Sequence, residues 1–99
     1  MAEIKVTSSE LKNKADELQK YVADFRAEVE KLVGYEQDLA GTWEGESQQA
    51  FRKAFNDDKA KMDTFALNID KYILALRTDA AKYEEAENKA TATATTRKS

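Results

Sequence analysis

Apolar residues recur at alternating steps of four and three residues along two long stretches of this sequence. The first run is Leu11, Ala15, Leu18, Val22, Phe25, Val29, Leu32, Leu39 and Trp43, with an interruption at Glu36. The second run is Phe51, Phe55, Met62, Phe65, Ile69, Tyr72, Leu76 and Tyr83, with breaks at Asp58 and Asp79. This 3.5-residue period predicts two α-helices with a left-handed supercoil, because a strand would need alternation by twos.

Residues that interrupt helices are confined to the middle of the chain. There is no proline, and the three glycines are Gly34, Gly41 and Gly45. We expect a first helix at about residues 8–40, a turn at 41–45 and a second helix at about 46–87. Gly41 is expected to end the first helix in the left-handed conformation. Gly34 is expected to stay helical at a cost of about 1 kcal/mol, with a kink as the alternative.

The connection between the two helices is short, which makes them antiparallel neighbours. We therefore expect residues 1–87 to form an all-α helical hairpin. Its first helix should begin at a capping box, Thr7-Ser8-Ser9-Glu10, in which Thr7 and Glu10 satisfy each other's backbone N–H groups. Residues 88–99 lack an apolar period and are expected to be a flexible C-terminal tail.

A two-helix hairpin has too little interior to be stable alone. Ordering about 75 helical residues needs more buried apolar surface than one seam between two helices provides. Ala66, Ile73 and Ala80 also widen the apolar face of the second helix beyond a single stripe. We therefore expect dimerisation into a four-helix bundle. The residues expected at the core and dimer interface are Leu11, Leu18, Val22, Phe25, Val29, Leu32, Phe51, Phe55, Met62, Phe65, Ile69, Tyr72 and Leu76.

The composition argues against an enzyme, a metal site and a nucleic-acid site. The chain has no histidine and no cysteine, so it lacks the commonest general base and the best zinc ligands. Its acidic pairs are expected to be solvated helix faces, and we expect no catalytic residue, no metal and no cofactor. Lysine and arginine are scattered and the formal net charge is −3, whereas nucleic-acid binding needs clustered cations.

Neither a cleavable signal peptide nor a membrane span is expected. The N-terminal residues have no apolar core, and no segment approaches the roughly 18 apolar residues of a span. Lysis of membranes is not expected either, because the polar faces mix both charges instead of presenting a basic face to anionic lipid.

The turn contains a Trp-x-Gly motif formed by Trp43, Glu44 and Gly45, and Tyr83 is followed four residues later by Glu87. A Trp-x-Gly motif alone would fit any turn that connects two helices. In their setting, near the midpoint of about one hundred residues and between two heptad helices, they resemble the WXG family of small Esx-type proteins. These early secreted antigen type proteins are substrates of type VII secretion systems. The resemblance covers the chain up to Glu87.

The resemblance implies a hairpin that forms homodimers or heterodimers with a sister WXG-type protein, packed as a four-helix bundle. It implies that Tyr83 and Glu87 form the Tyr-x-x-x-Asp/Glu export signal, joined in a dimer by Trp43 and Gly45, and that the secretion ATPase recognises it. It also implies secretion from a Gram-positive bacterium after a cytoplasmic stage. The resemblance fits either an effector or a secretion partner, and we expect a homodimer.

The residues singled out above also have simpler interpretations. Tyr83 fits an ordinary seam residue and Glu87 a solvated carboxylate at a helix end. Leu67 and Leu74, which project away from the core face, fit ordinary exposed leucines or a secondary docking surface. The alternative for the whole chain is a cytoplasmic helical adaptor with no role in export.

Overall fold

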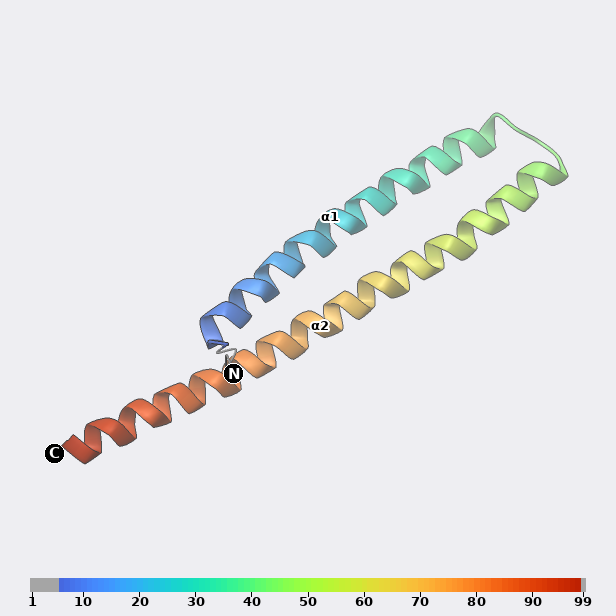
Figure 1. Cartoon of the computed structure of the whole chain (residues 1–99). Helices are drawn as coiled ribbons and strands as arrows, with labels where there is room; N and C mark the ends of the chain where they lie inside the picture. Colours follow the sequence, from blue (N-terminus) through green and yellow to red (C-terminus); the bar gives the residue numbers. More distant parts are fainter. Residues whose placement is uncertain (1–5, 99) are drawn as a thin grey trace, which may run out of the picture. The chain divides into compact units, whose positions relative to one another are not determined.

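The computed structural model describes residues 6–98, with side chains described through residue 91. Two helices account for nearly all of this part of the chain: α1, Ser8–Gly41, and α2, Glu46–Lys98. It contains no strand. Figure 1 shows the two helices joined by the short connection at residues 42–45, which confirms the predicted helical hairpin.

The start of α1 agrees with the predicted cap. Thr7 Oγ1 accepts a hydrogen bond from the Glu10 N–H at 3.1 Å, and the Thr7 carbonyl accepts one from the Leu11 N–H at 3.1 Å. Thr7 is therefore the N-cap residue. The reciprocal bond of a capping box, from the Thr7 N–H to the Glu10 carboxylate, is not formed among the described residues.

The turn corrects one expectation about glycine. Gly41 is the last residue of α1 and keeps an ordinary negative φ, so its predicted left-handed conformation is wrong. The left-handed residue is Gly45, with a φ of 105°, immediately before α2. The end of α1 is closed differently, because the Ala40 carbonyl accepts a bond from Gln48 Nε2 at 2.9 Å. A side chain from α2 thus satisfies a carbonyl that a left-handed glycine would otherwise cap.

The far end of α2 also differs from the expected boundary. The helix continues to Lys98, eleven residues beyond the predicted end near Glu87. The continuation contains neither proline nor glycine, and its alanines have the highest helix propensity, which offsets the weaker threonines. The flexibility of this segment stays a prediction, and Ser99 lies outside the described residues.

The chain divides into two compact units, one formed by residues up to Gln19 with those from Lys71 onward, and one by Lys20–Asp70. In the first, Ser8, Ala15, Ile73 and Ala80 are buried. Polar contacts toward the middle of the helices join them: Lys12 Nζ to Glu84 Oε2 at 2.8 Å, Arg77 Nη1 to Asp16 Oδ1 at 3.0 Å, and Arg77 Nη2 to Gln19 Oε1 at 2.6 Å. The contact of Ser8 with Glu87 is described below.

In the unit Lys20–Asp70, the buried residues are Val22, Val29, Glu36, Ala40 and Ala66. Phe25 and Phe65 pack edge to face with ring centroids 5.4 Å apart. Arg26 donates two hydrogen bonds to the Asp70 carboxylate, from Nη1 to Oδ1 at 3.2 Å and from Nη2 to Oδ2 at 2.6 Å. This hydrogen-bonded pair lowers the pKa of the Asp70 carboxyl and raises that of Arg26.

Small side chains dominate the interior of the hairpin. No large side chain of the described residues is fully buried, and the buried rows are spaced by seven residues: Ala15, Val22 and Val29 on α1, and Ala66, Ile73 and Ala80 on α2. The residues that we placed beside the seam of the second helix are therefore the ones that face α1. Most of the larger apolar side chains remain accessible in the single chain.

Candidate functional site

The turn holds Trp43 against the start of α2. Its ring lies 5.4 Å from that of Phe51, tilted by 42°, and the side chain is half-buried. The Trp43 N–H donates to the Ala40 carbonyl at 3.4 Å and the Thr42 N–H to the Leu39 carbonyl at 3.1 Å, so the last turn of α1 tightens before the chain reverses. Gly45 then supplies the positive φ that lets α2 begin.

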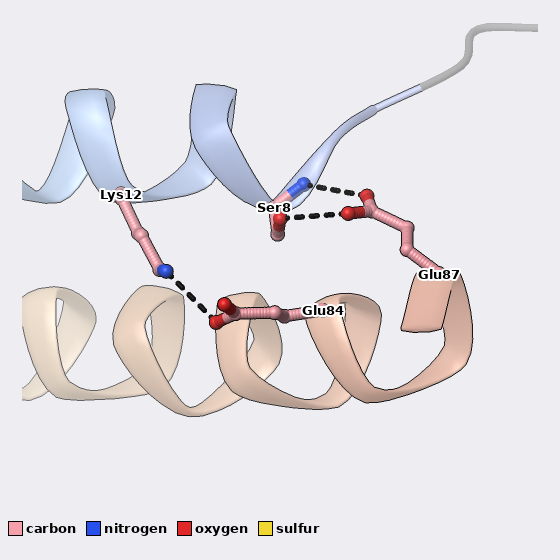
Figure 2. A network of polar contacts seen from close by, with 4 residues as sticks. All are labelled: Ser8, Lys12, Glu84 and Glu87. Atoms are coloured by element: carbon pink, nitrogen blue, oxygen red, sulfur yellow. Dashed lines mark hydrogen bonds and ion pairs between the residues drawn. The ribbon is translucent and has the colours of Figure 1, made fainter. Parts of the chain in front are cut away.

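Tyr83 and Glu87 lie one helical turn apart on α2. Tyr83 keeps 45% of its surface accessible. Glu87, in contrast, is hydrogen-bonded to α1. Its Oε1 accepts a hydrogen bond from the Ser8 backbone N–H at 3.1 Å, and its Oε2 accepts one from Ser8 Oγ at 3.0 Å. Figure 2 shows this contact beside the ion pair of Lys12 with Glu84. Glu87 is therefore not simply a solvated carboxylate, because it closes the first turn of α1.

The sequence contains a signal for this contact, although the spacing of Tyr83 and Glu87 alone did not predict it. Glu87 continues by seven the buried row of Ala66, Ile73 and Ala80, and Ser8 precedes Ala15 by seven. The interior rows of both helices thus end on a polar pair.

The expected core and dimer-interface residues fall into three groups by accessibility. Val22 and Val29 are buried inside the hairpin. Leu32, Phe65 and Tyr72 are exposed, with 53% of Phe65 and 58% of Tyr72 accessible. The remaining members are half-buried: Leu11, Leu18, Phe25, Phe51, Phe55, Met62, Ile69 and Leu76.

Within the unit Lys20–Asp70 the open apolar side chains line a groove of about 230 Å³. Leu32, Tyr35, Leu39, Phe51 and Phe55 form its walls, with Glu36 beside them. Glu36 is only 6% accessible, and its Oε1 accepts a bond from Arg52 Nε at 2.9 Å. The charge that interrupts the first apolar run is therefore paired, and the groove beside it remains apolar.

Leu67 and Leu74 are exposed, and their role as a secondary docking surface stays a prediction. Among the described residues, no cluster of three or more histidine, cysteine, aspartate or glutamate side chains is arranged to hold a metal ion. Over the same part of the chain, neither helix has a stretch long and apolar enough to cross a membrane.

The family model WXG100, proteins of 100 residues with WXG, matches residues 3–88. A structure of the secreted protein EsxB from Bacillus anthracis str. Sterne, selenomethionine-labelled, is 28% identical with a TM-score of 0.78, over 88% of this chain and 99% of that one. The wild-type EsxB structure is 29% identical with a TM-score of 0.76, over 84% and 89%. No curated protein matches the chain.

Proposed function

The chain belongs to the WXG100 family of helical hairpins, and on this premise we propose that it is a non-enzymatic Esx-type protein exported as a folded dimer by a type VII secretion system. One observation carries the proposal. A single hairpin holds the Trp43-Glu44-Gly45 turn and the pair Tyr83 and Glu87, and it leaves most of its large apolar side chains accessible.

The surface of the single chain supports dimerisation. Its accessible area is 7986 Å², whereas a compact monomer of 11.2 kDa has about 5,700 Å². This accessible area includes the apolar residues left open on one face, among them Leu32, Phe65 and Tyr72. A second hairpin, either another copy or a sister WXG-type protein, would remove that face from water.

The proposed export signal is assembled in the dimer. In an antiparallel pair the turn of one subunit lies near the C-terminal part of the partner's α2, so Trp43 and Gly45 join the partner's Tyr83 and Glu87. The secretion ATPase is the protein proposed to recognise this composite surface. Before export the protein resides in the cytoplasm of a Gram-positive cell, and after export it acts through helix-helix binding as an effector or a secretion partner.

Export can be tested directly. A tagged chain should appear in the culture supernatant of a host with an intact secretion ATPase and stay in the cells when that ATPase is deleted. Tyr83→Ala should abolish export while the purified variant stays helical. Glu85→Gln is the control, because Glu85 is an exposed neighbour whose one ion pair among the described residues is with Lys89 at 3.2 Å. Retention of the unaltered chain inside cells with an intact ATPase would instead support a cytoplasmic adaptor.

A further inference from the structure

Two acidic residues lie on the open apolar face of α2. Asp58 and Asp79 occupy the same seven-residue row as Phe51, Phe65 and Tyr72. Both are exposed in the single chain. Neither has a hydrogen bond or an ion pair to any described residue, so burying this row against an apolar partner would leave two uncompensated carboxylates.

Two lysines accompany them at the edge of the same face. Lys61 follows Asp58 by three residues and Lys82 follows Asp79 by three, and both lysines are exposed. Within the described part of the chain they too have no ion-pair partner. This sets the four residues apart from Arg52, Asp70, Arg77 and Glu84 on the same helix, each of which is bonded to α1.

The four charges are arranged symmetrically along α2. Asp58 and Lys82 each lie twelve residues from Asp70, and Lys61 and Asp79 each lie nine residues from it. When α2 packs antiparallel on a copy of itself about an axis at residue 70, every one of these carboxylates faces a lysine of the other copy. A parallel pairing in register would place like charges together, which disfavours it.

We propose that Asp58, Lys61, Asp79 and Lys82, here called the charge quartet, specify a second copy of this chain as the partner and fix an antiparallel homodimer with its axis near Asp70. This inference rests on the dimerisation proposed above. Charge complementarity identifies the partner. In an antiparallel pair of identical helices, the order Asp, Lys, Asp, Lys on one copy lies against Lys, Asp, Lys, Asp on the other. A sister chain would need the same spacing to satisfy it.

The axis also connects the quartet to the proposed export signal. Glu87 and Lys53 lie equally far from residue 70, so Glu87 of one copy lies at the same level along the helix pair as residue 53 of the other. That position is eight residues after Gly45, or about 12 Å along the helix. The quartet therefore sets the register that brings the turn of one copy toward the signal residues of the other.

Charge reversal tests the pairing. The variants are Asp58→Lys with Asp79→Lys, Lys61→Asp with Lys82→Asp, and all four substitutions together. Each double variant places like charges in four contacts and should weaken self-association by at least about thirtyfold. An equimolar mixture of the two doubles, and the quadruple variant alone, restore opposite charges and should regain the original affinity within about threefold. Sedimentation velocity over a concentration series measures each, and circular dichroism checks helicity.

The matched control is Asp57→Lys with Glu85→Lys, which makes the same change of net charge on the outer row of α2 and should leave the dimer intact. Unchanged association of the double variants, or no recovery in the mixture and the quadruple variant, would overturn the quartet while leaving dimerisation standing. A monomeric unaltered chain would instead overturn the proposed dimer itself.

Discussion

Glu87 holds the first residue of α1 through both oxygens of its carboxylate, accepting the Ser8 N–H at 3.1 Å and Ser8 Oγ at 3.0 Å. The first N–H groups of a helix have no partner within the helix, and the N-terminal end of its dipole favours an anion. The carboxylate that the family resemblance assigns to export is therefore also a tertiary cap that joins the two helices.

This double role predicts that stability and export can be separated at Ser8. Ser8→Ala removes the hydroxyl contact and leaves the backbone contact, so it should lower the free energy of unfolding by about 0.5–1.5 kcal/mol while Glu87 remains available for recognition. Urea denaturation at a fixed protein concentration measures the loss. Ser9→Ala is the control, since Ser9 is exposed. Equal stability of the two variants would contradict the cap.

The turn predicts opposite effects for two glycines four residues apart. Gly45 has a φ of 105° and free space around its Cα, so Gly45→Ala should cost about 1–2 kcal/mol through backbone strain alone. Gly41 is helical with equally free space, so Gly41→Ala should stabilise by about 0.5–1 kcal/mol. Thermal denaturation of both variants checks the pair, and destabilisation by Gly41→Ala would show that the turn differs from this description.

The contact between Arg26 and Asp70 predicts a pH dependence. The hydrogen bond from Arg26 lowers the pKa of Asp70 below the ordinary aspartate value, so the contribution of this contact to stability is present above that ordinary value and is lost as the pH falls through the lowered pKa. Carboxyl titration by NMR should find a lowered pKa for Asp70 in the unaltered chain and a higher one, close to that of an ordinary aspartate, in Arg26→Gln. An unshifted Asp70 in the unaltered chain would contradict the contact.

The sequence predicted the hairpin because two long heptad runs and the position of three glycines leave few other folds. It was less informative about which row faces inward. Large residues such as Phe65 and Tyr72 fit the seam by spacing, yet the interior of the hairpin is lined by Ala15, Ala66 and Ala80, whose small side chains let the helices approach. Spacing defines a face but does not say which neighbour covers it.

The sequence predicted which residues form the candidate site but not the contacts that they make. Trp43 and Gly45 fall at the turn, as their spacing indicated. The left-handed residue is Gly45 and not Gly41, and the Ala40 carbonyl at the end of α1 accepts a hydrogen bond from the Gln48 side chain. The contact of Ser8 with Glu87 joins positions 79 residues apart. The seven-residue rows place both residues on the inward faces, but the rows alone do not say which residue of one helix lies beside which residue of the other.

The most direct test of the account is the mass of the purified full-length chain in solution. Light scattering after size exclusion, at tens of micromolar, should give a helical species of twice the 11.2 kDa chain mass, because one hairpin leaves Phe65 and Tyr72 accessible. A well-folded helical monomer at the same concentration would contradict it.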